Sequence, residues 1–145
     1  MTNKILIADD EKIVRALIRK ILENEKYEVI EAVNGDEAVK SAKKENPDVI
    51  LIDVKMPVMD GVTACRKLKT DEKTKNIPIL MITALAETKM EAIKAGVDDF
   101  INKPFDPIEV SIRVKSMLKL RNLTDELQKI SVYGDEIEKQ RKKKS

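Results

Sequence analysis

The chain of 145 residues contains no histidine and no tryptophan, and its one cysteine is Cys65. The absence of histidine excludes Ser-His-Asp triads, histidine metal sites and a phosphohistidine on this chain. A single cysteine excludes an internal disulfide and favours a cytoplasmic protein. Four glycines and five prolines are too few for a disordered or fibrous chain.

Long apolar runs and a strong charge of one sign are also absent. No apolar run approaches the ~20 residues that cross a bilayer, so we expect no contact with a membrane. The start, Met1–Lys4, leads into a short apolar run that does not fit a signal peptide. The net charge is +2, and the only basic run is Arg141–Lys144, so we do not expect nucleic-acid binding.

The residues that are present suit one compact domain, because 42% are hydrophobic and 37% are charged. Continuous apolar runs predict strands that are buried on both faces. These runs are Ile5–Ala8, Val49–Ile52, Ile79–Ile82 and the shorter Phe100–Ile101. The segment Tyr27–Ala32 alternates in part, which is typical of a strand nearer an edge.

Helical patterns lie between these strands. They occupy Ile13–Leu22, Gly35–Lys44, Gly61–Leu68, Thr88–Ala95 and the chain from Pro107 onward. Five repeats of strand and helix predict an α/β fold with a parallel sheet covered on both faces. The burial pattern fits a flavodoxin-like, doubly wound sheet of five strands in the order 2-1-3-4-5.

Two of these helices carry specific expectations. Ile13 and Leu17 belong to a wide apolar stripe that we expect to face the sheet. In Thr88–Ala95 the only large apolar side chains are Met90 and Ile93. We expect those two residues to anchor a helix that is the most mobile in the fold.

The last part of the chain has its own pattern. Leu120, Leu123, Leu127 and Ile130 follow steps of three and four residues, which predicts that the fifth helix continues as a coiled-coil-like extension. We therefore divide the chain into a domain at 1–121 and a helical extension at 122–145 that ends in a frayed basic tail. The stripe could support a homodimer, or its leucines could pack back on the domain.

Polar residues follow four of the predicted strands. These are Asp9, Asp10, Asp53, Thr83 and Lys103. In open parallel sheets the carboxyl ends of the strands meet at one edge, where ligands bind. Crowded carboxylates repel one another, and oxygen donors without Cys or His favour Mg²⁺. A carboxylate beside Mg²⁺, a lysine and a hydroxyl is suited to phosphoryl transfer and could itself become an acyl phosphate.

Four segments together resemble the response-regulator receiver domain of two-component systems, and in particular a chemotaxis-regulator-like domain. They are Ile5–Glu11, Ile52–Gly61, Thr83-Ala84 and Phe100–Phe105, and the resemblance covers about residues 3–121. It implies a phosphorylation-dependent signalling switch and no enzyme, since the protein would only assist its own phosphorylation and dephosphorylation.

The resemblance implies a role for each matching position. Asp53 would accept the phosphoryl group. Mg²⁺ would be bound by Asp10 and Asp53 directly, by Asp9 through water and by the backbone carbonyl of Lys55. Gly61 would allow the turn into the third helix.

Further positions would hold the phosphoryl group or respond to it. Thr83, Ala84 and Lys103 would bind the group, and Lys103 would precede a cis proline. Thr83 and Phe100 would form the switch that changes the face of helix 4, strand 5 and helix 5. Lys55 and Leu85 would tune how readily water reaches the acyl phosphate.

The partners implied are a sensor histidine kinase or a histidine phosphotransfer protein, because the chain has no histidine of its own. We expect docking on the first helix, whose exposed side would carry Arg15, Arg19 and Lys20. The output would be an unknown downstream partner of a single-domain regulator or a fused output domain, and both interpretations stay open.

The alternative function is a Mg²⁺-dependent phosphatase of the haloacid-dehalogenase type, which also uses an aspartate nucleophile. That class expects a second Asp two residues after the first, where this chain has Lys55. A nucleotide-binding P-loop and a dinucleotide-binding Gly-x-Gly-x-x-Gly motif are both absent from the sequence.

Overall fold

The computed structural model contains one parallel sheet in the order β2-β1-β3-β4-β5, which confirms the predicted topology. It describes residues 2–84 and 86–144, without the side chains of Ala86, Thr124 and 128–144. The strands are β1 (Lys4–Ala8), β2 (Glu28–Ala32), β3 (Val49–Ile52), β4 (Ile79–Thr83) and β5 (Asp99–Asn102). The helices are α1 (Lys12–Asn24), α2 (Gly35–Glu45), α3 (Gly61–Thr70), the short 3₁₀ turn η1 (Ala86–Thr88), α4 (Lys89–Ala95) and α5 (Pro107–Lys144).

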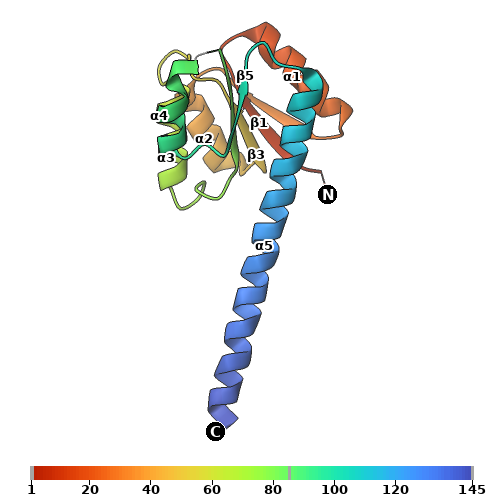
Figure 1. The fold of residues 1–145 in the computed structure, drawn as a ribbon, viewed down its shortest axis with the longest axis vertical. Coiled ribbons are helices and arrows are strands. Elements are labelled where there is room, and N and C mark those ends of the chain that lie inside the picture. The colour runs from red at the N-terminus through yellow and green to blue at the C-terminus, as the bar shows by residue number, and fades with distance from the viewer. Residues whose placement is uncertain (1, 85, 145) are drawn as a thin grey trace.

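Helices cover both faces of the sheet (Figure 1). Alternate side chains of a strand enter different cores, as Leu6 packs with residues of α2, α3 and α4, whereas Ile5 packs with residues of α1 and α5. The side chains of β3 and β4 are all buried, and the outer strands β2 and β5 are only partly buried. This gradient is the one that the apolar runs predict.

The prediction that Ile13 and Leu17 face the sheet is wrong. Helix α1 packs through Ile18 and Leu22, whereas Ile13 is 83% exposed and Leu17 is 45% exposed. The apolar stripe is wider than the strip of helix that touches the sheet. Its outer part stays in solvent. At the C-terminal end of α1, the Ser111 hydroxyl donates to Glu25 Oε1 at 3.1 Å and joins α5 to α1.

The prediction that Met90 and Ile93 anchor α4 is also wrong. Both side chains are more than half exposed, and the buried residues of the helix are Ala92 and Ala95. Helix α4 lies close to α3, where Cys65 Sγ is 3.6 Å from the carbonyl oxygen of Ala95. Only small side chains fit at that distance, so α4 is held by its alanines.

Helix α5 has 38 residues, which corresponds to about 57 Å at 1.5 Å per residue. Its C-terminal half projects away from the sheet (Figure 1). Arg121 Nη1 donates to the carbonyl oxygens of Pro47 and Asp48 at 3.0 and 3.3 Å, which ties the helix to the loop before β3.

The leucines of the predicted stripe do not pack back on the domain. Leu120, Leu123 and Leu127 are each more than half exposed, and the side chain of Ile130 lies outside the described part of the structure. Among the described residues, no helix combines the length and the apolar character needed to cross a membrane.

Candidate functional site

Three aspartates meet at the carboxyl edge of the sheet, as the sequence predicts. Asp9 follows β1 directly, Asp10 comes next, and Asp53 follows β3. One carboxylate oxygen of each lies within 4.8 Å of those of the other two. Asp9 and Asp53 are buried, with 3% and 7% of their surface exposed, whereas Asp10 is exposed. The topology thus concentrates negative charge at one point.

Lys103 joins two of these carboxylates. Its Nζ lies 2.9 Å from Asp9 Oδ2 and 2.9 Å from Asp53 Oδ2. The residue follows β5, and its bond to Pro104 is cis, as expected. Burial lowers the pKa of Lys103, but the bonds to Asp53 and Asp9 outweigh burial, so its pKa is raised and the ammonium stays charged.

Backbone amides take the other oxygens of the buried pair. The Val54 N–H donates to Asp53 Oδ1 at 2.7 Å, and the Glu11 N–H donates to Asp9 Oδ1 at 2.8 Å. Burial raises the pKa of Asp9, although the Glu11 amide and Lys103 act in the opposite direction. Both side chains are therefore fixed by two bonds each, which leaves them little rotational freedom.

A cavity of about 410 Å³ opens over these groups. Its lining contains six residues to which the resemblance gives a role, together with Glu11: Asp10, Asp53, Lys55, Thr83, Ala84 and Lys103. Thr83 is buried at the end of β4, whereas Ala84 and Lys55 are exposed. From the sequence we assigned no role to Glu11, although it follows the two aspartates directly. Leu85 lies outside the described residues.

Phe100 does not line this cavity. It is half-buried against the core beneath α2, α3 and α4, beside Met81 of β4. The Nζ of Lys89 in α4 lies 5.9 Å from the centre of its ring. The aromatic side chain therefore connects β5 with α4.

Gly61 brings α3 against the phosphoacceptor candidate. A Cβ at this position would collide with the carbonyl oxygen of Asp53. The Gly61 N–H also donates to the Val54 carbonyl oxygen at 2.8 Å. The missing side chain thus allows the contact that fixes the start of the loop after β3.

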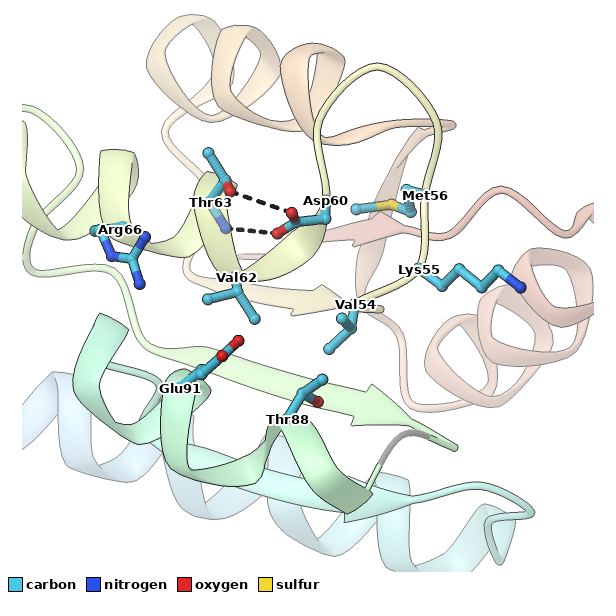
Figure 2. A pocket seen from close by; sticks show the side chains of 9 residues that line it. All are labelled: Val54, Lys55, Met56, Asp60, Val62, Thr63, Arg66, Thr88 and Glu91. Atoms are coloured by element: carbon cyan, nitrogen blue, oxygen red, sulfur yellow. Dashed lines mark hydrogen bonds between the residues drawn. The ribbon is translucent and has the colours of Figure 1, made fainter.

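A second, larger cavity of about 550 Å³ lies between α3 and α4 (Figure 2). Asp60 lines it, but its carboxylate accepts bonds from the Thr63 amide and hydroxyl, as the N-cap of α3. The Lys55 side chain extends away from the other lining residues. This cavity lacks the convergent carboxylates of Asp9, Asp10 and Asp53, which we call the acidic site. It is therefore the weaker candidate for phosphoryl chemistry.

The donor set of the acidic site fits a hard divalent cation. Three carboxylates face one ammonium group, so the cluster carries an excess of negative charge. All available donors are oxygens, because Cys65 is buried against Ala95 and the chain has no histidine. Oxygen ligands with an open side toward solvent suit Mg²⁺ better than Zn²⁺.

Of the three residues predicted on the exposed side of α1, Lys20 is exposed, Arg19 has 37% of its side chain exposed, and Arg15 is largely buried. Arg15 and Arg19 turn toward β2, where their Nε atoms bind the two carboxylate oxygens of Glu31 at 3.1 and 2.9 Å. Only 13% of the Arg15 side chain is exposed, whereas Lys20 is exposed. The ion-pair partner of these arginines lies on another element, β2, so the sequence of the helix alone does not identify it.

The response regulator receiver domain family matches residues 5–115, and the chain belongs to this family of two-component signalling proteins. It is 44% identical over 123 residues to the transcriptional regulatory protein ResD of Bacillus subtilis. That match covers 83% of this chain and 50% of ResD, so the chain spans about half the length of this relative. The acidic cluster is typical of the phosphorylation site of receiver domains.

Solved structures agree with the sheet order. A response regulator from Chloroflexus aurantiacus is 36% identical with a TM-score of 0.79, over 82% of this chain and 99% of its own. The receiver domain of the sensor histidine kinase PA1611 from Pseudomonas aeruginosa is 29% identical with a TM-score of 0.77. The match covers 82% of this chain and 99% of that receiver domain. Its structure has a magnesium ion in the active-site cleft. The comparisons do not support the haloacid-dehalogenase alternative.

Proposed function

We propose that Asp53 accepts a phosphoryl group from a phosphohistidine on a partner protein. The bridge that Lys103 makes between Asp9 and Asp53 is the observation that carries this proposal, because it orients Asp53 and supplies positive charge beside it. An oxygen of Asp53 attacks phosphorus in line with the P–N bond. The new O–P bond forms as that bond breaks, and its electron pair leaves with the imidazole nitrogen.

The other residues of the site would bind the cation or stabilise the phosphoryl group. Asp9, Asp10, Asp53 and the backbone carbonyl of Lys55 would hold Mg²⁺, which offsets charge on the transferring oxygens when it is bound. Lys103 turns its ammonium toward the phosphoryl group after Asp53 is modified. The chain thereby assists its own phosphorylation. Attack by water on the acyl phosphate then breaks the O–P bond, which releases inorganic phosphate and restores the Asp53 carboxylate.

The conformational switch begins with residues at the same carboxyl edge of the sheet, which respond to the phosphoryl group. The Thr83 hydroxyl and the Ala84 amide bind the phosphoryl group, and Thr83 moves toward Asp53. Phe100 follows, and the face formed by α4, β5 and α5 changes, since the buried side chains of α4 are two small alanines. Lys55 and Leu85 control the access of water and hence the lifetime of the acyl phosphate.

The donor is a sensor histidine kinase or a histidine phosphotransfer protein. We place its docking surface on the exposed side of α1, at Ile13, Leu17 and Lys20, in place of the two arginines. Helix α1 begins two residues after Asp10, so this surface adjoins the acidic site. Exposed apolar residues next to a reactive site are typical of a protein-binding surface.

The output is a downstream partner or a fused domain, and residues 122–145 form the helical extension that carries the signal onward. A second copy of the chain binds along Leu120, Leu123, Leu127 and Ile130. The exposure of the three described leucines, at heptad spacing on a helix that projects from the domain, supports this pairing.

Intact-mass measurement with Mg²⁺ and a small acyl phosphate donor tests the proposed function. The wild type gains the mass of one phosphoryl group, and Asp53→Asn gains none. Asp60→Asn is the matched control and keeps the gain, because that carboxylate caps α3 and is not part of the acidic cluster. A gain that persists in Asp53→Asn overturns the proposal.

A further inference from the structure

Arg15 connects three parts of the molecule that meet at the acidic site. Its Nη1 donates to the carbonyl oxygen of Asp9 at 2.8 Å, and its Nε donates to Glu31 Oε1 at 3.1 Å. Helix α1 therefore holds both β2 and the loop that carries the first two aspartates. The side chain is largely buried, so these bonds are shielded from solvent.

The carbonyl of Asp9 belongs to the peptide bond that leads to Asp10. The Asp9 N–H donates to the Ala32 carbonyl oxygen at 3.2 Å, so both backbone groups of Asp9 are engaged. The orientation of this peptide plane sets the direction in which Asp10 leaves the strand. A bond to the carbonyl therefore acts on the next residue.

Asp10 depends on its backbone for position. Within the described part of the chain its carboxylate makes no hydrogen bond and no ion pair, and it is exposed. Repulsion from Asp9 and Asp53 favours rotation of Asp10 toward solvent. The backbone must therefore keep its carboxylate within 4.8 Å of the other two.

We propose that Arg15 is a positioning residue for the divalent-cation site, acting through the Asp9 carbonyl to hold Asp10 in place before the cation binds. This inference rests on the proposed function. The planar guanidinium can bind a carboxylate and a carbonyl at once, which the single ammonium of lysine does less well. Partners outside the ligand shell commonly change metal affinity by about 10–100-fold.

Arg19 provides a matched control. It binds the same Glu31 carboxylate through Nε at 2.9 Å, but its other contacts are Glu23 and the Val29 carbonyl, away from the acidic site. Arg15→Gln and Arg19→Gln each remove one positive charge near the cluster. Loss of charge alone would strengthen Mg²⁺ binding in both variants, whereas loss of positioning weakens it only in Arg15→Gln.

The experiment is a calorimetric Mg²⁺ titration of the wild type, Arg15→Gln and Arg19→Gln, with thermal unfolding in the absence of Mg²⁺ to show that each is folded. We expect Arg15→Gln to bind Mg²⁺ about 10-fold more weakly, and Arg19→Gln to bind as tightly as the wild type or tighter. Phosphorylation of Arg15→Gln should recover at saturating Mg²⁺, because the reacting groups are intact.

Equal or tighter Mg²⁺ binding by Arg15→Gln would overturn the inference. If Arg15→Gln does not fold, Glu31→Gln is the second test, and its affinity should fall below that of Glu23→Gln, which removes the same negative charge but contacts Arg19 instead of Arg15. Equal affinities of those two variants would also overturn the inference. A wild type that binds no Mg²⁺ would instead overturn the proposed function.

Discussion

Val58 has a backbone φ of 68°, although it is β-branched and 82% exposed. It is the central residue of a tight turn, in which the Met59 N–H donates to the Pro57 carbonyl oxygen at 2.7 Å. A turn of this kind costs valine about 1–3 kcal/mol, which glycine avoids. We expect Val58→Gly to raise the free energy of unfolding by about 1 kcal/mol in urea denaturation, after the larger entropy of unfolded glycine is subtracted.

Val33→Gly is the matched control for this prediction. Val33 is another partly exposed valine, and it is not among the described residues with positive φ. Replacing Val33 by glycine should lower the free energy of unfolding, because no backbone strain is relieved at this position and the unfolded chain gains entropy. If Val58→Gly is destabilising by the same amount, the strain at Val58 is absent.

Cys65 should be almost unreactive in the folded protein. Its side chain is fully buried, and burial raises the pKa of the thiol to about 11. At pH 8 only about one thiol in a thousand is then a thiolate, which is the reactive form. We expect maleimide labelling to be slow in buffer and to become fast in denaturant, as followed by intact mass. Rapid labelling of the native protein would contradict this burial.

At the residue scale, the sequence predicts a side chain well where topology alone decides its place. Asp9, Asp53, Thr83 and Lys103 each lie at the end of a strand, so the sheet order was enough to bring them together. Arg15 could not be predicted in the same way. Its role depends on the position of Glu31 and of one carbonyl oxygen, and neither has a signature in sequence.

Helix α3 and the loop before it depend on a close backbone contact at Gly61. An added Cβ would meet the Asp53 carbonyl, which cannot move without shifting the phosphoacceptor candidate. We expect Gly61→Ala to lower the free energy of unfolding by about 2 kcal/mol. It should also slow phosphoryl uptake from an acyl phosphate donor, as measured by intact mass over time.

Gly35→Ala separates the two effects of that substitution. Its Cβ would collide with the carbonyl oxygen of Met59, in the same loop but away from Asp53. This variant should lose stability and keep the wild-type rate of phosphoryl uptake. Equal rates in Gly61→Ala and Gly35→Ala would show that the contact at Asp53 is unimportant for the reaction.

At the element scale, the apolar runs and the helical periodicity predicted the five strands and the five α-helices, but not the 3₁₀ turn at Ala86–Thr88 or which apolar residues are buried. Met90 and Ile93 are the large side chains of α4, yet its alanines make the contact because α3 is so close. Ile13 and Leu17 continue the stripe of α1 beyond the edge of its packing surface. The distance between neighbouring elements decides both cases, and a single helix does not encode it.

The whole molecule is a compact domain with a long helix projecting from it (Figure 1). If a second copy pairs with this helix, Leu123→Glu combined with Leu127→Glu should convert a dimer into a monomer in sedimentation equilibrium. Asn122→Glu is the control for an added negative charge, since it places one glutamate at an exposed position beside the stripe. A wild type that stays monomeric at high concentration would contradict pairing along the leucines.

The boundary at residue 121 stays a prediction. It coincides with Arg121, the residue that ties α5 to the loop before β3. The heptad spacing of the leucines indicated the extension, because an apolar stripe without a strand to cover it needs another partner.

The measurement that tests the account most directly is the chemical identification of the phosphorylated residue. Borohydride reduces an acyl phosphate on aspartate to the alcohol, so treatment of the phosphorylated protein marks the acceptor as homoserine in a peptide map. The account predicts homoserine at position 53 alone, and only when Mg²⁺ is present. Homoserine at another aspartate, or a phosphate that withstands borohydride on a serine or threonine, would contradict it.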